Sequence, residues 1–232
     1  MFAFAGRAVS MREAPAAMFS RIAPQKDMTM KLLHLDSSIL GDNSVSRTLS
    51  KAAVAKVVAE HPDIEVTYHD LVAHPITHLT GRYLAGQSDN VQHDQALQED
   101  LRLGGKVLAE FLAADIVVIG VALYNFSISS QLKTWIDRIC VAGKTFRYTD
   151  AGPEGLVGDK RVILTIARGG LYGPGTPSRP FEHAETLLRA VLGFIGITQP
   201  DVVIAEGLAF GVEAREASTK AALETIADLK AA

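Results

Sequence analysis

Short apolar runs alternate with longer amphipathic stretches from residue 31 to the end of the chain. Runs that are rich in β-branched residues and bounded by turn residues are typical of strands. Five such runs predict strands over residues 31–36, 64–70, 115–123, 160–167 and 201–208. The third, DIVVIGVAL, is apolar almost throughout, which is typical of a central parallel strand that is covered on both faces.

The segments between these runs carry apolar residues at helical spacing. They predict helices over about 44–61, 92–113, 129–143, 181–192 and 212–229. In the third helix Cys140 falls on the same apolar face as Trp135 and is expected to be a small core residue, and Gly143 is a natural stop. Residues 71–90 are polar and are expected to form an irregular loop, and residues 145–158 a small hairpin or excursion.

Strand and helix therefore alternate five times. This pattern predicts an α/β fold with a doubly wound parallel sheet, helices on both faces and the flavodoxin-like strand order 2-1-3-4-5. Residues 30–232 are expected to form this one domain. In such sheets ligands bind beyond the carboxyl ends of the strands, so the loops after the first, third and fourth strands should carry the chemistry.

Residues 1–29 do not fit the repeating pattern. Arg7 and Arg12 interrupt every apolar stretch that a signal peptide would need. We expect a disordered extension, or an upstream start with Met28 or Met30 as the true beginning.

Composition narrows the function classes. The 232 residues are 48% hydrophobic and 21% charged, with a net charge of −3, so nothing steers the whole surface toward nucleic acid or anionic lipid. No apolar run from residue 30 onward is long enough for a membrane helix, and the single cysteine allows no internal disulfide, which favours a cytoplasmic protein. His69, His74 and His78 are expected to be free surface histidines, and we predict no metal site.

The loop after the first strand, within HLDSSILGDNSVSR, indicates an anion site. Asn43, Ser44 and Ser46 lie around the first turn of the expected helix, where free amides and the helix dipole favour a phosphate. The plainer alternative is that Asn43 or Ser44 simply caps the helix. The loop has neither the Walker nor the dinucleotide glycine pattern, so a mononucleotide phosphate fits it best.

The two other loops have the residues that a flat ring needs. Leu123, Tyr124, Asn125 and Phe126 supply apolar and aromatic walls, although the aromatic pair could also be core at a strand end. The segment ARGG, residues 167–170, holds paired glycines that let backbone N–H groups approach a ligand, or that form an ordinary turn.

Several stretches together resemble the FMN-dependent NADH azoreductases of bacteria, which also act as NADH:quinone oxidoreductases. LDSSILGDNSVS is similar to their phosphate loop and LYNFSISSQLKTWIDRI to their isoalloxazine loop, and GKTFRYTDAGPEGLV and LGFIGIT are near-verbatim family stretches. The resemblance covers nearly everything from Met30 onward. Ala167 departs from the usual serine and Leu123 from the common methionine.

The resemblance implies bound FMN, a homodimer and a set of site residues. Phosphate and ribityl contacts would come from Ser38, Ser44, Val45 and Ser46. Contacts to the flavin ring would come from Leu123, Tyr124, Asn125, Phe126, Ala167, Arg168, Gly169 and Gly170, and Tyr148 would line the substrate site.

The resemblance also implies the reaction. NADH would reduce the flavin, and a quinone or azo compound would then take the same place and be reduced, which gives ping-pong kinetics with no catalytic side chain. A flavodoxin-like electron carrier, a WrbA-like quinone reductase and a binding protein that has lost FMN remain as alternatives.

Overall fold

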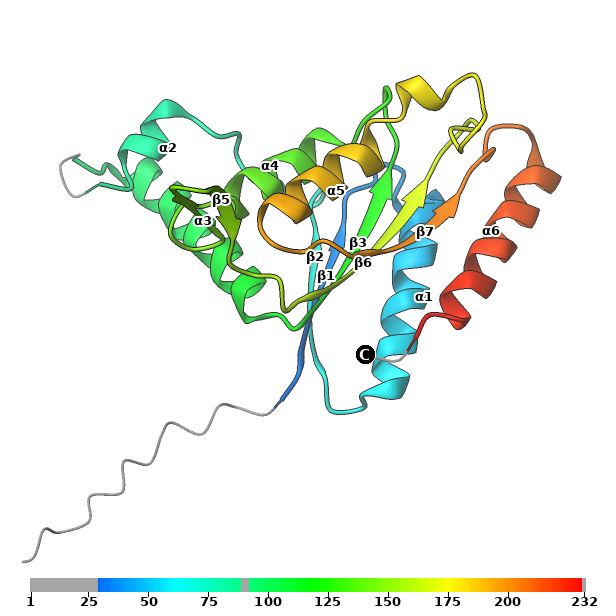
Figure 1. The fold of residues 1–232 in the computed structure, drawn as a ribbon, viewed down its shortest axis with the longest axis horizontal. Coiled ribbons are helices and arrows are strands. Elements are labelled where there is room, and N and C mark those ends of the chain that lie inside the picture. Colours follow the sequence, from blue (N-terminus) through cyan, green and yellow to red (C-terminus); the bar gives the residue numbers. More distant parts are fainter. Residues whose placement is uncertain (1–28, 89–91, 231–232) are drawn as a thin grey trace, which may run out of the picture.

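A computed structural model describes residues 29–88 and 92–230. Five parallel strands form its central sheet: β1 (Lys31–Asp36), β2 (Glu65–Asp70), β3 (Ile116–Ala122), β6 (Arg161–Ala167) and β7 (Asp201–Ala205). Their order is β2-β1-β3-β6-β7, which is the predicted order 2-1-3-4-5 once the strands of the sheet are counted among themselves (Figure 1). Residues 1–28 lie outside the described residues, so the extension expected over residues 1–29 stays a prediction.

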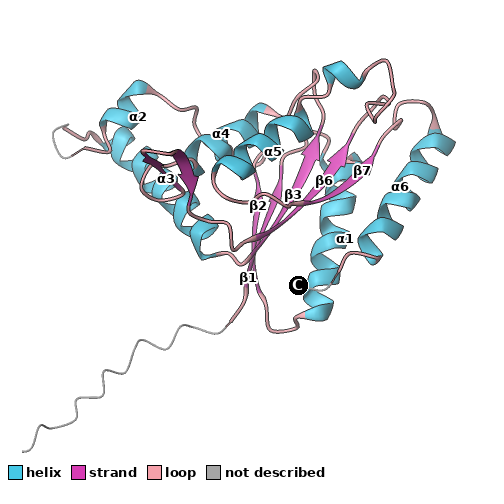
Figure 2. Ribbon diagram, in the orientation of Figure 1, coloured by secondary structure: helices cyan, strands magenta, loops and turns pink. Residues whose placement is uncertain are grey.

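Helices cover both faces of the sheet, as Figure 2 shows. One layer contains α3 (Gln95–Ala113), α4 (Ser130–Ile139) and α5 (Ala184–Phe194), whose apolar side chains form one core with β1, β3 and β6. The other layer contains α1 (Val45–Glu60) and α6 (Val212–Ala227), which form a second core cluster on the opposite face. Cys140 packs against the first cluster, and burial raises the pKa of its thiol, as expected for a core residue.

The register brings the carboxyl ends of three strands to one edge. Asp36 in β1 pairs with Gly120 in β3, and Ala122 at the end of β3 pairs with Ala167 at the end of β6. The loops that follow these strands therefore emerge side by side, because parallel strands in register end together. This is the edge at which the sequence predicts ligand binding.

The prediction of a continuous loop over 71–90 was wrong in one place. A short helix, α2 (Gly81–Ala85), begins there because the side chain of Thr80 caps it by accepting from the Tyr83 amide. Tyr83 is buried against Gly104 of α3, where a Cβ would overlap its hydroxyl. The Arg138 guanidinium lies 3.7 Å from the centre of the Tyr83 ring, a cation–π contact that helps to hold the ring.

Helix α4 ends at Ile139, four residues before the predicted stop at Gly143. The Thr145 hydroxyl donates to the Ile139 carbonyl at 2.6 Å and ends the helix. The predicted hairpin follows as β4 (Phe146–Thr149) and β5 (Gly152–Gly155), and it packs against α5. None of the described helices is long and apolar enough to cross a membrane.

Three further expectations need correction. His69 is not a free histidine in an irregular loop: it lies in β2, and its Nε2 is 2.8 Å from a carboxylate oxygen of Glu110. The last predicted strand ends three residues early, at Ala205, and the fourth helix begins three residues later and ends two residues later than expected. Helix α5 begins at Ala184 because η2 (Arg179–Phe181) precedes it and the Glu182 carboxylate accepts from the Ala184 and Glu185 amides.

Candidate functional site

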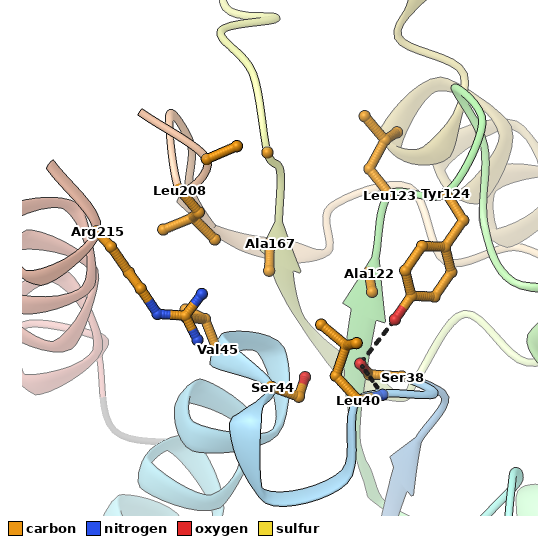
Figure 3. Close-up of a pocket in the computed structure, with 12 residues that line it drawn as sticks. Ser38, Leu40, Ser44, Val45, Ala122, Leu123, Tyr124, Ala167, Leu208 and Arg215 are labelled. Atoms are coloured by element: carbon orange, nitrogen blue, oxygen red, sulfur yellow. Dashed lines mark hydrogen bonds between the residues drawn. The ribbon is translucent and has the colours of Figure 1, made fainter. Parts of the chain in front are cut away.

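A pocket of about 250 Å³ opens at the carboxyl edge of the sheet, between the first turn of α1 and the loops after β3, β6 and β7 (Figure 3). Its lining combines hydroxyls, small strand-end residues, apolar walls and one cation. The lining residues are Ser38, Leu40, Ser44, Val45, Ala122, Leu123, Tyr124, Ala167, Gly169, Leu208, Ala209 and Arg215. One end of the pocket is therefore polar and the rest is mostly apolar.

The polar end is the start of α1. Ser44 is the N-cap residue, and its Oγ accepts from the Arg47 amide at 3.4 Å and lies 3.0 Å from Oγ of Ser46. Among the described residues the amides of Val45 and Ser46 have no hydrogen-bond acceptor. Ser44 is thus both the cap that the plainer alternative predicted and part of a cluster of donors that suits an anion.

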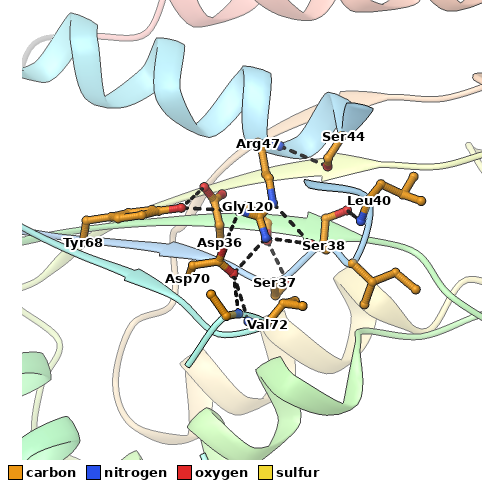
Figure 4. A network of polar contacts seen from close by, with 12 residues as sticks. Asp36, Ser37, Ser38, Leu40, Ser44, Arg47, Tyr68, Asp70, Val72 and Gly120 are labelled. Carbon is orange, nitrogen blue, oxygen red and sulfur yellow. Dashed lines mark hydrogen bonds and ion pairs between the residues drawn. The ribbon is translucent and has the colours of Figure 1, made fainter. Parts of the chain in front are cut away.

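Arg47, the one cation of the quoted loop, is turned away from this end and braces the loop from behind (Figure 4). Its guanidinium donates to both oxygens of Asp70, at 2.7 and 2.8 Å, and to the carbonyl of Ser38 at 2.8 and 3.2 Å. The hydrogen bonds from Arg47 to the Asp70 carboxylate lower the pKa of Asp70 to about 2, so this carboxylate stays ionised and neutralises Arg47. Arg47 therefore shapes the loop without presenting its charge to the pocket.

A second carboxylate, the buried Asp36 of β1, also supports the loop. Asp36 accepts from Ser50 at 2.7 Å and from Tyr68 at 3.2 Å. Burial, followed by the charge of Asp36, raises the pKa of Tyr68 to about 12, so the phenol remains a donor. Gly120 is required opposite, because a Cβ at that position would overlap the Asp36 carboxylate.

The loop after β3 is a tight turn with strained backbone. Tyr124 and Ser127 exchange backbone hydrogen bonds at 2.9 and 3.0 Å, and the two residues between them have positive φ, 45° at Asn125 and 74° at Phe126. A side chain at positive φ costs about 1–2 kcal/mol, so this conformation needs support from its surroundings. The Phe126 carbonyl accepts a hydrogen bond from the His183 amide, and the centre of the Phe126 ring lies 5.2 Å from that of the Phe181 ring.

The glycine loop after β6 is bonded to the loop after β7. The carbonyls of Arg168, Gly169 and Gly170 accept from the amides of Leu208, Ala209 and Gly207, respectively. Gly169 lines the pocket, but the Arg168 side chain does not. The Arg168 guanidinium is 1% exposed and lies 2.8 to 3.5 Å from the carboxylates of Glu185, Glu182 and Glu206.

Most of the predicted site residues meet at this pocket. Ser38, Ser44, Val45, Leu123, Tyr124, Ala167 and Gly169 line it, and Ser46 lies directly behind Ser44. Asn125 lines an adjoining pocket that shares Leu123 and Tyr124, while the half-exposed Phe126 stands beside Phe181. The structure places Arg168 in an ion-pair cluster and Tyr148, 73% exposed, on the hairpin, away from the pocket.

Reasoning from the sequence missed the pocket residues that come from the last part of the chain: Leu208, Ala209 and Arg215. The predicted strand order contained a usable indication, because it places the first and last helices on the same face of the sheet. Arg215 stands in the first turns of α6, and α6 packs against α1. Ala122, which is adjacent to the predicted Leu123, and Leu40, which lies two residues after Ser38, were also missed.

The pocket's geometry suits a ligand with an anionic end and a flat apolar body. Unpaired amides and hydroxyls at the α1 terminus can bind a phosphate, and Ala122 and Ala167 at the strand ends leave room for a ring between Leu123, Tyr124 and Leu208. Because the donors converge on one end only, the pocket would bind such a ligand in a single orientation.

Comparisons with known proteins agree with this geometry. A family model described as a flavodoxin-like fold matches residues 30–229. The chain is 60% identical over 203 residues to an FMN-dependent NADH:quinone oxidoreductase of Methylorubrum extorquens, and the match covers 88% of this chain and 100% of the relative. It is 62% identical over 195 residues to an FMN-dependent NADH:quinone oxidoreductase of Xanthomonas campestris pv. campestris, and that match covers 83% of this chain and 96% of the relative. The crystal structure of an azoreductase from Bacillus anthracis superposes with a TM-score of 0.78 at 32% identity, covering 86% of this chain and 97% of the other. The resemblance seen in the sequence is confirmed: the chain belongs to the flavodoxin-like family that includes the FMN-dependent NADH:quinone oxidoreductases and the azoreductases.

Proposed function

We propose that this protein is an FMN-dependent NADH oxidoreductase that reduces quinones and cleaves azo bonds. The observation that carries the proposal is the pocket at the carboxyl edge of the sheet, with phosphate donors at one end and a flat apolar slot beyond them. The relatives that match most of the chain are named FMN-dependent NADH:quinone oxidoreductases, and a structural neighbour is named an azoreductase.

The chain's own residues fit FMN well. The amides of Val45 and Ser46 and the hydroxyl of Ser44 would hold the phosphate, and Ser38 would contact the ribityl chain. Leu123, Tyr124 and Ala167 would contact the ring on one side, and the amides of Gly169 and Gly170 would reach its polar edge, since their carbonyls are already bonded to the loop after β7. FMN supplies the two-electron chemistry, and the protein binds it, orients it and leaves its face open to NADH and to the acceptor.

We further propose that two copies of the chain form the working unit, in the cytoplasm. Tyr148 is 73% exposed on the β4–β5 hairpin, so it would line a substrate site only across a dimer interface. Other large apolar side chains are exposed as well, among them Phe126, Phe181 and Phe210. Sedimentation velocity tests the dimer, and a Tyr148→Ala variant tests its contact: a higher KM for quinone with unchanged FMN content supports the proposed role.

A spectroscopic experiment tests the central proposal. The purified protein should be yellow from bound FMN, should bleach when mixed anaerobically with NADH, and should recover its colour when a quinone is added. Bound flavin that NADH does not reduce would instead indicate an electron carrier. A protein that neither carries nor takes up FMN would contradict the proposal.

Steady-state kinetics then test the order of the reaction. With NADH and a quinone varied together, a ping-pong reaction gives parallel lines in a double-reciprocal plot, whereas lines that converge would contradict a shared place for the two substrates. The same assay with an azo dye compares the two acceptor classes, and NADPH in place of NADH tests the choice of donor.

A further inference from the structure

We infer that Arg215 of α6 provides the positive charge for the phosphate end of the pocket and makes the site prefer FMN to unphosphorylated riboflavin. This inference rests on the proposed function, because it names a residue of the same site.

The first argument is position. Arg215 lines the pocket together with Ser44 and Val45, and Figure 3 shows its side chain reaching from α6 toward the first turn of α1. One guanidinium nitrogen donates to the Asn43 carbonyl at 2.6 Å, just before the Ser44 cap. This hydrogen bond holds the guanidinium beside the unpaired amides and leaves its other N–H groups available.

The second argument is charge. Arg47 is neutralised by Asp70, and Arg168 by a group of glutamates. Within residues 29–88 and 92–230, Arg215 has no carboxylate within salt-bridge distance although it is half-buried. A guanidinium that lacks an anionic partner, at the edge of a pocket with unpaired amides, is suited to a dianionic phosphate.

The third argument is the packing of α6 against α1. The phosphate loop follows β1, whereas Arg215 lies near the end of the sequence and reaches the loop only because α1 and α6 pack on the same face of the sheet. Arg215 would therefore tie the last helix to the loop after β1 when the phosphate is bound. Bound FMN should stabilise this contact more than riboflavin does.

The test compares two flavins that differ only in the phosphate. Full-length protein freed of flavin is titrated with FMN and with riboflavin, and flavin fluorescence reports Kd for wild type, Arg215→Gln, Arg215→Lys and Lys220→Gln. We expect Arg215→Gln to raise the Kd for FMN by about tenfold to a hundredfold, the range of a charge-assisted hydrogen bond, and to change the Kd for riboflavin less than about twofold. Arg215→Lys, which keeps the charge, should fall between Arg215→Gln and wild type.

Lys220→Gln is the matched control, because it removes the same charge from the same helix at a side chain that is 80% exposed. Its Kd for FMN should stay close to that of wild type. The dependence of the FMN Kd on salt concentration should also be weaker in Arg215→Gln than in wild type, because one ion pair is lost.

Three results would overturn the inference. If Arg215→Gln binds FMN as well as wild type, Arg215 does not contact the phosphate, although the proposed function stands. If the affinities for FMN and riboflavin fall together, the side chain only shapes the pocket. If wild-type protein binds no FMN, both this inference and the proposed cofactor fail.

Discussion

The phenol oxygen of Tyr124 lies 2.9 Å from the hydroxyl oxygen of Ser38, and so ties the loop after β3 to the loop after β1. The same phenol accepts from the Ile39 amide at 3.2 Å. One side chain that was predicted to be a flavin wall thus also positions the loop that was predicted to hold the phosphate. The two halves of the pocket are coupled before any ligand binds.

Tyr124→Phe should loosen this coupling. Loss of one partly buried and one exposed hydrogen bond is expected to lower the free energy of unfolding by about 1 kcal/mol, and FMN binding should weaken with it. Urea denaturation and a flavin titration measure the two effects. Tyr148→Phe is the control, because that phenol is on the exposed hairpin, and an equal loss in both variants would contradict the coupling.

Ser44→Asp separates the capping role of Ser44 from its role in binding. Aspartate caps a helix as well as serine does, so the free energy of unfolding should change little. Its carboxylate would stand where the phosphate is expected, and the two negative charges would repel each other. The Kd for FMN, measured by fluorescence titration, should therefore rise at least tenfold, which corresponds to a loss of roughly 1.4 kcal/mol or more of binding free energy. Ser44→Ala should show the reverse balance, with a loss of about 1 kcal/mol of stability and a smaller effect on binding. Unchanged FMN affinity in Ser44→Asp would contradict the assignment of the phosphate end.

The Arg47–Asp70 ion pair should make stability depend on pH. Its hydrogen bonds lower the pKa of Asp70 from 3.8 to about 2 in the folded protein. Since the folded pKa lies below the unfolded one, the stabilisation is fully present above about pH 4 and is lost as the pH falls toward 2. After allowance for solvent screening it amounts to about 1 kcal/mol.

Asp70→Asn tests this link in urea denaturation curves recorded between pH 5 and about pH 2. The variant should be less stable than wild type above pH 4, and the difference should shrink as the pH falls. Glu154→Gln is the control, because the Arg147–Glu154 pair is exposed and should contribute little at any pH. A stability difference that does not vary with pH would show that Asp70 acts through packing and not through its charge.

Gly104 and Gly105 provide a matched pair of substitutions in α3. A Cβ at Gly104 would overlap Tyr83, a buried side chain with Arg138 stacked on its ring, whereas a Cβ at Gly105 meets nothing within 4 Å. Gly104→Ala should therefore destabilise the fold by about 1–3 kcal/mol. Gly105→Ala should stabilise it by up to about 1 kcal/mol, because alanine is the better helix former. Thermal melts of the two variants should shift in opposite directions, and shifts of the same sign would be evidence against the close approach of Tyr83.

The order of strands, the two helical layers and the ligand edge could all be predicted from the sequence. The reason is physical: an apolar run such as Ile116–Ala122 is stable only when both of its faces are buried, and in a chain that alternates strands with helices a parallel sheet covered on both sides achieves this. The serines of the first loop and the residues after β3 could be placed at one edge for the same reason. Periodicity failed where a single side chain ends or starts a helix, as Thr145 does for α4 and Thr80 for α2.

Sequence alone thus determined that the loops after β1, β3 and β6 meet and which residue types these three bring to the pocket, because hydrophobic spacing along the chain sets the sheet and its edge. Only the tertiary structure decided which cations remain available there. Arg47, adjacent to the serines in sequence, is neutralised by Asp70, while Arg215, 171 positions after Ser44, lies at the pocket with no carboxylate partner among the described residues. Charge pairing depends on distances between segments that are remote along the chain, and local sequence patterns do not predict those distances.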